Sequence, residues 1–320
     1  MSHNINSNIV LLIGTGPMAV AYAKVLQGQK IDFQVVGRGV ASAQIFYEET
    51  GKKPITGGLE LFLENNDVSQ FDVAIIATGS EVLLECLNLL IQHSITKILI
   101  EKPAAVSIAE LNNNKELFLP HATSVFVAYN RRFYASVLET ERLIEADGGL
   151  EAMNFEFTEW THKIDASKKV PAVLNNWFFA NSTHVVDLAF FLAGKPLDWT
   201  AYSKKGNLEW HEKTVFSGAG ITEKGVLFSY LSHWESAGRW GIELLTQNRK
   251  IYLKPLEGVL IQRKGLLDIE KHVFDNTLDV LYKPGLFRQV EAFLNNDNSR
   301  LINIKEHLEI ANQIYIKILS

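Results

Sequence analysis

The stretch that decides the fold of the N-terminal half is Ile9-Val10-Leu11-Leu12-Ile13, followed at once by Gly14-Thr15-Gly16-Pro17-Met18-Ala19. Five consecutive apolar residues have the length of a buried strand, and residues 19–26 continue in good helix formers. The turn between them fits the pattern G-x-G-x-x-[GA], in which the first glycine permits the tight turn and the second lets backbone approach a pyrophosphate. The sequence therefore predicts a strand, a phosphate-binding turn and a helix whose first amides attract the anion.

Strand and helix patterns alternate through the rest of this half. Apolar runs of strand length occur at 33–36, 73–77 and 97–100, and helix-like stretches occur at 40–50 and 82–92. This alternation is typical of a doubly wound parallel sheet. We therefore expect residues 1–124 to form a dinucleotide-binding Rossmann domain of the α/β class.

The pattern changes in the second half. After a strand at 125–128 and a helix at 136–146, polar and apolar residues alternate at 150–160, 225–234 and 241–245, with shorter strands at 250–253 and 259–263. One strong helix, 184–192, interrupts them, and helices at 285–294 and 304–319 end the chain. Such alternation favours a mainly antiparallel open sheet of α+β type. Residues 125–320 are thus predicted to bind substrate and to form a homodimer or homotetramer through the exposed sheet face.

Composition excludes several classes of protein. A formal net charge of −5 gives no general attraction for nucleic acid or for anionic membranes. The single cysteine, Cys86, lies in an apolar run and is expected to be a small buried hydrophobe. The sequence shows no secretory signal and no apolar run long enough to span a membrane, so we expect a cytoplasmic protein.

Cofactor preference is predicted from the end of the second strand, Val35-Val36-Gly37-Arg38. Sites that prefer NAD carry an acidic residue there, whereas an arginine accommodates the 2′-phosphate of NADP. Arg38 can pair with phosphate through its planar guanidinium, which favours NADP(H). The alternative is that Arg38 only stacks on the adenine, which leaves NAD(H) possible.

Three further motifs, together with the glycine turn, carry a resemblance over nearly the whole chain. They are Glu101-Lys102-Pro103, Tyr129-Asn130-Arg131-Arg132 and Ser182-Thr183-His184-Val185-Val186-Asp187. In this order and spacing they resemble the Gfo/Idh/MocA family, the glucose-fructose oxidoreductase and inositol dehydrogenase group. The resemblance implies an NAD(P)-dependent oxidoreductase of sugar metabolism. Its substrate would be a sugar, sugar acid or sugar nucleotide, with hydride moving between nicotinamide and a carbinol or keto carbon.

The resemblance also implies roles for individual residues. Lys102 would lie beside the nicotinamide and His184 would face the substrate oxygen, so these two are the predicted catalytic residues. Asp187 is expected to interact with local backbone or to orient its neighbours rather than to react. The predicted cofactor-binding residues are Gly14, Thr15, Gly16, Pro17, Met18, Gly37, Arg38, Thr78, Gly79, Glu101, Lys102 and Asn130. The predicted substrate-binding residues are Tyr129, Arg131, Asn176, Trp177, Asn181 and His184.

One departure from the family pattern bears on the chemistry. Many of its sugar and cyclitol dehydrogenases carry an aspartate four residues before the histidine, and this chain has Ala180 there. Proton transfer would then rest on Lys102 and His184, which keeps a reductive direction open. Two other readings stay open: a dinucleotide-binding regulator without turnover, and a reductase of an imine, a linear tetrapyrrole or another carbonyl compound. No metal site is predicted, because the histidines are scattered and hydride transfer does not require one.

Overall fold

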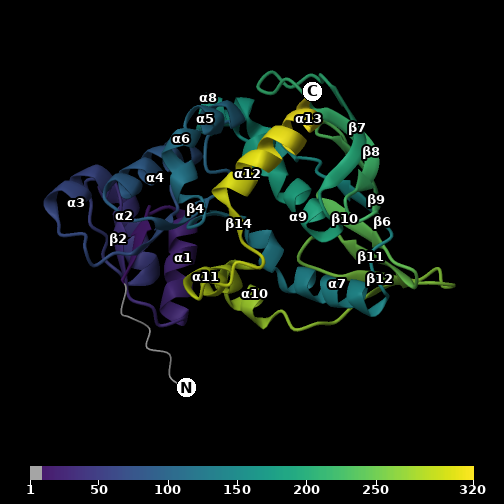
Figure 1. The fold of residues 1–320 in the computed structure, drawn as a ribbon, viewed down its shortest axis with the longest axis horizontal. Helices are drawn as coiled ribbons and strands as arrows, with labels where there is room; N and C mark the ends of the chain where they lie inside the picture. The colour runs from purple at the N-terminus through teal and green to yellow at the C-terminus, as the bar shows by residue number, and fades with distance from the viewer. Residues whose placement is uncertain (1–8) are drawn as a thin grey trace. The chain divides into compact units, whose positions relative to one another are not determined.

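The structure is a computed structural model and describes residues 9–320 (Figure 1). Its internal contacts define two compact units. The first contains the described residues up to Tyr129 together with Leu286–Glu309, and the second contains Asn130–Gly285 and Ile310–Ser320. This division differs from the predicted domains 1–124 and 125–320, because strand pairing assigns two segments beyond residue 124 to the first unit.

The first unit is built on a six-stranded sheet in the order β14-β5-β4-β3-β1-β2. All neighbours are parallel except β14, which runs antiparallel to β5 at the edge. β5 pairs with β4 and continues the parallel sheet. β14, which belongs to the segment Leu286–Glu309, pairs with β5 and so returns this later part of the chain to the first sheet. The Rossmann-type doubly wound sheet is thereby confirmed. Its strands are β1 (Val10–Ile13), β2 (Phe33–Val36), β3 (Val73–Ile76), β4 (Lys97–Glu101), β5 (Val125–Ala128) and β14 (Ile302–Asn303).

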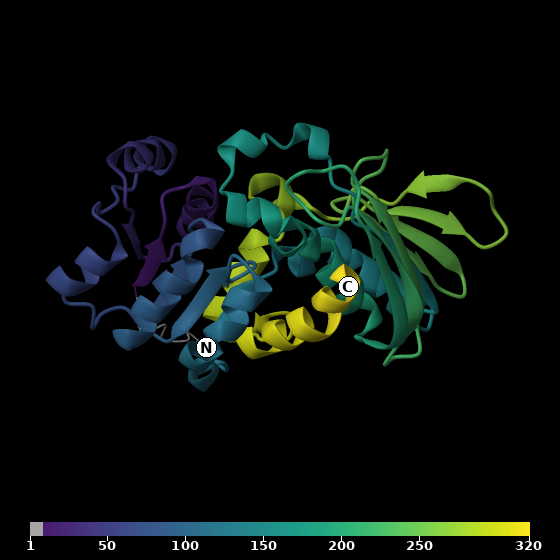
Figure 2. The same ribbon diagram turned by 90° about the horizontal axis from the view of Figure 1, so that it is seen from above.

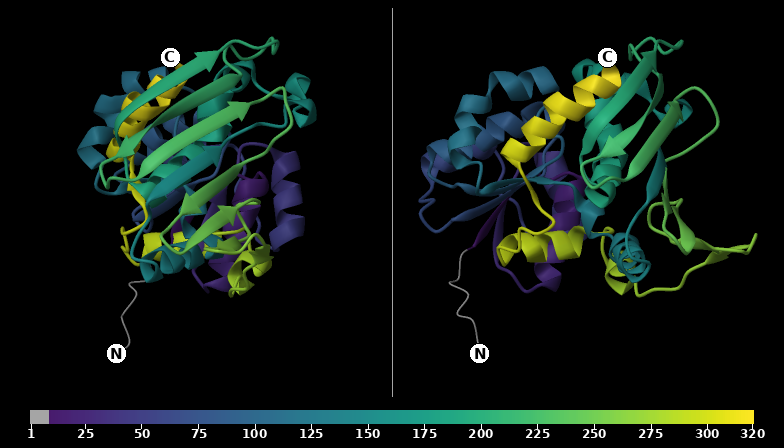
Figure 3. Two further views of the ribbon diagram at one scale, coloured as in Figure 1. Left: turned by 90° about the vertical axis from the view of Figure 1, so that its right-hand side faces the viewer. Right: turned by 45° about the vertical axis from the view of Figure 1, so that its right-hand side comes forward.

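Helices lie on both faces of this sheet (Figure 3, right). Helix α1 packs against α11, and α3 packs against α4. Because both faces are covered, most strand residues are buried, and the strands appear in the sequence as mainly apolar runs. The helices of the first unit are α1 (Pro17–Gly28), α2 (Val40–Thr50), α3 (Leu59–Asn65), α4 (Leu83–Gln92), α5 (Ile108–Asn113), α6 (Lys115–Phe118), α11 (Leu286–Leu294) and α12 (Ile304–Ile310).

The second unit is built on an eight-stranded sheet in the order β13-β12-β11-β10-β6-β9-β8-β7. Only the central pair β6 and β9 is parallel, which confirms a mainly antiparallel sheet. Figure 2 shows the hairpin β12–β13 extending from one edge. The strands are β6 (Ala152–Glu156), β7 (Pro196–Lys204), β8 (Val215–Thr222), β9 (Leu227–His233), β10 (Gly241–Leu245), β11 (Arg249–Leu253), β12 (Leu260–Arg263) and β13 (Ile269–Lys271).

Helix α9 (Thr183–Ala193) covers one face of this sheet and contacts β6. Aromatic rings fill the space between them; Phe155, for example, lies 5.5 Å from Phe190 and 5.1 Å from Tyr230, centroid to centroid. The helix ends before Gly194, whose φ of 88° suits glycine. The predicted helix 184–192 is thus confirmed. The other helices are α7 (Ala135–Ala146), α8 (Pro171–Asn175), α10 (Thr277–Leu281) and α13 (Ile316–Leu319). No helix within residues 9–320 is both long and apolar enough to cross a bilayer.

The opposite face of the sheet, whose strands are seen in Figure 3 (left), carries exposed apolar side chains. Tyr202 and Leu231 lie in one cross-strand row, 70% and 62% exposed. Leu227 and Leu245 lie in another row on either side of Ala152. Apolar area of this kind is common at interfaces. Its predicted use between copies of the chain stays a prediction.

Candidate active site

The glycine turn lies where the strand order of the first unit reverses, since β1 pairs with β2 on one side and with β3 on the other. Ligands of open α/β sheets bind outside the carboxyl ends of the strands at this point. Gly14 has φ +118°, and a Cβ there would lie 2.4 Å from the carbonyl oxygen of Ala77. The turn that follows β1 therefore requires glycine at position 14.

Gly16 has a different reason for being glycine. It precedes α1 with Pro17 at the first helical position, and a Cβ on Gly16 would meet no atom within 4 Å. The fold itself therefore has room for a side chain here. That open space lies before the free amides of the helix start, next to half-buried Met18, and suits a pyrophosphate.

Other predicted cofactor residues surround this turn. Thr15 shares a hydrogen bond of 2.8 Å with Ser42, and Gly37 packs so closely on Thr15 that a Cβ would lie 2.5 Å from its methyl carbon. Arg38 follows β2, is exposed, and makes no ion pair with any residue in 9–320. Thr78 and Gly79 follow β3. These residues all lie at the carboxyl ends of β1, β2 and β3, as a dinucleotide site requires.

Glu101 and Lys102 lie at the carboxyl end of β4 and are both half-buried. The hydroxyl of Tyr22 donates a 2.8 Å hydrogen bond to the Glu101 carboxylate. Burial, reinforced by the Glu101 charge, raises the pKa of Tyr22, so this hydroxyl stays a donor. Glu101 is thus tied to α1, the helix that begins at the glycine turn.

The turn after Lys102 is held by a residue that we did not predict. His307 of α12 is completely buried, and its Nε2 lies 2.9 Å from the carbonyl oxygen of Pro103, which assigns the proton to Nε2. Its Nδ1 lies 3.5 Å from the hydroxyl of Tyr129. Predicted substrate residue Tyr129 is 1% exposed, so its contact with His307 gives it a supporting position. The chain between these residues is too long for a sequence pattern to link them.

Asn130 likewise makes a structural contact. Its side-chain amide donates 2.9 Å to the carbonyl oxygen of Pro284, and a Cβ on Gly285 would lie 2.1 Å from the Asn130 carbonyl oxygen. Asn130 therefore has a structural role in holding the segment at Pro284 and Gly285. Its predicted contact with the cofactor stays a prediction. Arg131 is half-buried and stacks on Trp240, with 4.9 Å between its guanidinium carbon and the ring centroid.

Arg132 and Asp187 form a buried bidentate ion pair in the second unit. Nε and an Nη of Arg132 donate to the two carboxylate oxygens at 2.8 and 2.6 Å. Two parallel charge-assisted hydrogen bonds fix both side chains. This agrees with the expectation that Asp187 orients its neighbours, and it connects the Tyr129–Arg132 motif to α9.

His184 is the second residue of α9 and is 8% exposed. Its ring lies against Trp240, 6.0 Å between centroids. A π-helical turn, Phe178–Ser182, precedes the helix and includes Ala180, and π-helical turns are frequent at functional sites. Helical structure therefore begins before residue 184, where the helix was predicted to start, because the π-helical turn runs directly into α9.

The carboxylate missing at position 180 has a counterpart that the sequence analysis did not identify. Glu159, beyond the end of β6, is 2% exposed. Asn181 donates to one of its oxygens at 2.8 Å and Ser182 to the other at 2.6 Å. These donors directly follow Ala180, so the buried carboxyl group is bonded to the same turn where the family resemblance leads one to expect an aspartate. Predicted substrate residue Asn181 is thereby engaged by Glu159.

A signal for Glu159 was present in the alternation of residues 150–160. Met153, Phe155 and Phe157 are buried, and Glu159 continues their parity. Burial raises the pKa of Glu159, against the lowering effect of the hydrogen bonds from Ser182 and Asn181. A polar residue at an inward position of a strand is uncommon and merits a functional reading.

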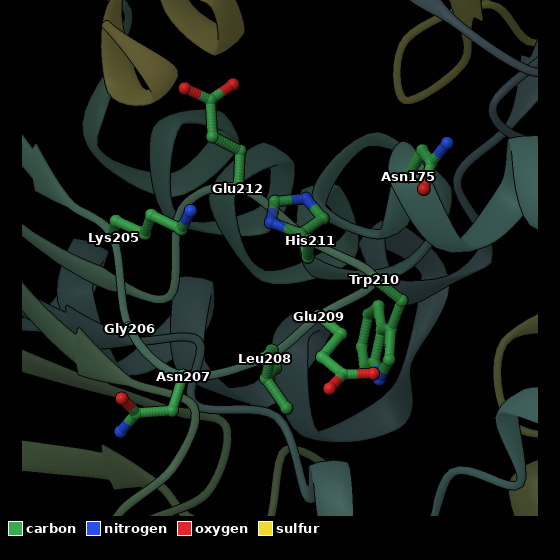
Figure 4. A pocket seen from close by; sticks show the side chains of 9 residues that line it. All are labelled: Asn175, Lys205, Gly206, Asn207, Leu208, Glu209, Trp210, His211 and Glu212. Carbon is green, nitrogen blue, oxygen red and sulfur yellow. The ribbon is translucent and has the colours of Figure 1, made fainter.

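Asn176 and Trp177, also predicted to bind substrate, lie at the end of α8. Asn176 donates 2.9 Å to the carbonyl oxygen of Ala172. Trp177 packs edge to face on Trp210, 5.9 Å between centroids. Trp210 lines an open pocket of about 630 Å³ formed by Asn175 and residues 205–212 (Figure 4). None of the predicted site residues lines this pocket.

Two other expectations concern chemistry away from these motifs. Cys86 is buried, and burial raises the pKa of its thiol to about 11, which keeps it protonated and unreactive. This agrees with its interpretation as a small hydrophobe. Within the described part of the chain, no group of three or more His, Cys, Asp and Glu side chains could hold a metal ion.

The raised pKa of Glu159 predicts a pH dependence of stability. Its stabilising contribution is fully present below the pKa of the unfolded chain and is lost as pH rises through the folded pKa. We expect the unfolding free energy of the wild type, minus that of Glu159→Gln, to fall as pH rises above about pH 4, where the carboxyl group of the unfolded chain ionises. Urea unfolding measures it, with exposed Glu60→Gln as the control. A difference that stays level or increases with pH would contradict the assignment.

Comparison with known proteins covers the two units differently. The family model described as shikimate / quinate 5-dehydrogenase matches residues 1–102, which contain the glycine turn and end at Lys102. No curated protein sequence matches the chain.

Solved structures match nearly the whole chain. An oxidoreductase from Agrobacterium radiobacter in complex with NAD+, L-tartaric acid and magnesium has a TM-score of 0.75 at 13% identity, covering 98% of this chain and 97% of that one. UDP-N-acetylglucosamine 3-dehydrogenase GnnA from Acidithiobacillus ferrooxidans has 0.69 at 14%, covering 97% of each chain. A variant of a 3-ketoreductase from Actinomadura kijaniata, with TDP-benzene and NADP, has 0.70 at 13%, covering 96% of each. The chain therefore has the fold of NAD(P)-dependent oxidoreductases, which confirms the fold that the Gfo/Idh/MocA resemblance implied.

Proposed function

We propose that this protein is an NAD(P)-dependent oxidoreductase of the Gfo/Idh/MocA type that acts on a CH–OH or C=O group of a sugar, sugar acid or sugar nucleotide. The observation that carries the proposal is the open space at Gly16, before the first amides of α1 and at the point where strand order reverses. No packing demand explains a glycine there, whereas a pyrophosphate does.

The residues of the first unit fit a bound dinucleotide. The turn Gly14–Gly16 and the start of α1 would hold the pyrophosphate, and Arg38 would meet the 2′-phosphate of NADP(H). When bound, the nicotinamide supplies or accepts the hydride. Tyr22 donates to Glu101, and His307 bonds the Pro103 carbonyl oxygen; these contacts on either side of Lys102 support the proposed position of the lysine.

Proton transfer is assigned to Lys102 and His184. In the reductive direction a hydride adds to the carbonyl carbon and one proton must reach the carbonyl oxygen; oxidation reverses both transfers. An ammonium or an imidazolium donates that proton, and the neutral forms accept it. The hydrogen bonds of Glu159 hold the turn before His184, so this carboxyl group positions the histidine in place of an aspartate at 180.

The substrate class is supported by the descriptions of the related structures. One of them acts on a UDP-linked sugar, and another is a 3-ketoreductase crystallised with a TDP derivative. Amide, hydroxyl and indole groups around His184 suit a polyhydroxylated compound. A dinucleotide-binding regulator remains the second candidate, because Ala180 removes a carboxylate that the related sugar dehydrogenases use.

The first prediction from this proposal tests the pyrophosphate site. Gly16→Val should abolish NADPH binding while the protein remains folded, since its side chain enters space that the fold leaves open. Calorimetric titration with NADPH measures binding, and circular dichroism checks folding. A folded Gly16→Val protein with wild-type NADPH affinity would show that the turn does not hold the cofactor.

A second prediction concerns cofactor preference. Arg38→Asp should lower the ratio of NADP(H) to NAD(H) affinity by roughly 10- to 100-fold, because a charge-assisted pair is lost and a repulsion is added. Exposed Lys115→Asp in α6 is the matched control for net charge and should leave the ratio unchanged. An unchanged ratio in Arg38→Asp removes Arg38 from the 2′-phosphate site.

The third prediction separates catalysis from binding. Lys102→Met should lower kcat by roughly 100-fold or more while NADPH affinity stays within several-fold, and His184→Ala should have a smaller effect of the same kind. A panel of sugars, sugar acids and nucleotide sugars, followed by NADPH absorbance, identifies the substrate first. Near wild-type kcat in both variants would overturn the proton-transfer assignment. If nothing in the panel turns over although NADPH binds tightly, the regulator becomes the better reading.

A further inference from the structure

Two arginines of the second unit share one tryptophan next to His184. The guanidinium carbon of Arg239 lies 4.8 Å from the ring centroid of Trp240, and that of Arg131 lies 4.9 Å from it. Arg239 also lies 4.7 Å from the ring centroid of Trp160. Because the His184 ring contacts the same indole, both positive charges lie one ring away from the proposed proton-transfer group.

We propose that Arg131 and Arg239, stacked on Trp240, bind the anionic group of a small substrate, a carboxylate or a phosphate, whose reacting oxygen meets His184. This inference rests on the proposed function and narrows its substrate class to charged sugar derivatives. Arg131 was a predicted substrate residue, whereas Arg239, Trp160 and Trp240 were not part of the predicted site.

Stacking leaves the N–H edge of a guanidinium outside the ring contact, although one Nη of Arg131 already donates to the side-chain oxygen of Asn130 at 3.4 Å. Aromatic rings contact the flat faces of the group, whereas its five N–H donors point outward in its plane. That edge matches a carboxylate or phosphate in a bidentate manner. Arg239, with rings of both Trp160 and Trp240 within stacking distance, forms no ion pair with any residue in the described range 9–320.

The charges around the tryptophan favour an anion. Two guanidinium groups on one indole repel each other, and a bound anion relieves that repulsion. Of the nearby carboxylates, Asp187 is engaged by Arg132, and Glu159 accepts hydrogen bonds from Asn181 and Ser182 while the charge of Arg239 acts on it without an ion pair between the two. A guanidinium is positive at every physiological pH, so the region keeps a positive charge.

The loop that carries Arg239 is rigidly built. The Arg239 amide donates 3.0 Å to a carboxylate oxygen of Glu156, and the Trp160 indole donates 2.8 Å to the Gly238 carbonyl oxygen. Gly238 has φ +147°, and a Cβ on it would lie 2.0 Å from the same Glu156 oxygen. The backbone that carries Arg239 is therefore held by specific bonds before any ligand arrives, which lowers the backbone entropy lost on binding.

The test compares anionic and neutral polyols on the NADPH-loaded protein by calorimetric titration. One arm uses D-gluconate against D-sorbitol, and the other uses D-glucose 6-phosphate against D-glucose, so the arms separate carboxylate from phosphate. We expect the anion to bind roughly tenfold or more tightly than its neutral match in at least one arm. Equal affinity for anion and neutral polyol in both arms would overturn the proposal.

Variants then assign the preference to these residues. Arg239→Gln and Arg131→Gln should each lower the anion affinity roughly tenfold and leave the neutral polyol unchanged. Arg239→Lys keeps the charge but loses the planar fork, so it should recover only part of the affinity. Arg263→Gln, an exposed arginine paired with Glu270 on β12, is the matched control. An anion preference that survives in Arg239→Gln and Arg131→Gln contradicts the assignment.

Failure of this inference is distinguishable from failure of the proposed function. If NADPH binds and a substrate turns over but anions have no advantage, only the charged substrate class is wrong. If NADPH does not bind, the proposed function fails, and the same titrations without NADPH still decide whether Arg131 and Arg239 bind an anion.

Discussion

The second unit depends on the buried ion pair between Arg132 and Asp187. Its two hydrogen bonds fix the start of α9 to the segment that follows β5, and breaking a buried pair of this kind typically costs about 3–5 kcal/mol. His184 lies between Asp187 and Ser182, and Ser182 is bonded to Glu159. The histidine is thus held from both sides of its position in the chain, so the geometry of the proposed proton-transfer group follows from two buried carboxyl groups.

Glu159 offers a physical explanation for the alanine at position 180, where the family pattern has an aspartate. A carboxyl group bonded to the π-helical turn can support the histidine from a neighbouring strand end, without an aspartate on the turn itself. The first unit uses a similar device, because His307 and Tyr22 hold the residues around Lys102 from helices distant in sequence. In both units, buried side chains from other segments bond the residues next to the proposed catalytic group, which favours a preorganised site over a regulator.

Much of the fold was predictable from local patterns, and the exceptions have identifiable causes. The strands Phe33–Val36, Val125–Ala128 and Gly241–Leu245 have the predicted bounds. Strand β8 was missed because its glycines indicate turns, whereas Gly218 makes room for the ring of Tyr230 on β9 and Gly220 lets the backbone of β7 at Asp198 and Trp199 approach closely. Likewise, no local period reveals that β14 returns to the first sheet, and the parity that places Glu159 inward does not reveal its partners Asn181 and Ser182. The motif residues were predictable in place, while their supporting partners come from distant segments.

The central claim is that hydride passes between a nicotinamide and a carbon of a sugar-type compound. The most direct measurement is the fate of deuterium from NADPH labelled at the transferring position of nicotinamide C4, followed by mass spectrometry of the product formed from the active member of a keto-sugar panel. The account predicts one deuterium bound to carbon in the product and none lost to solvent. Product that forms without the label, or deuterium released into water, would contradict it.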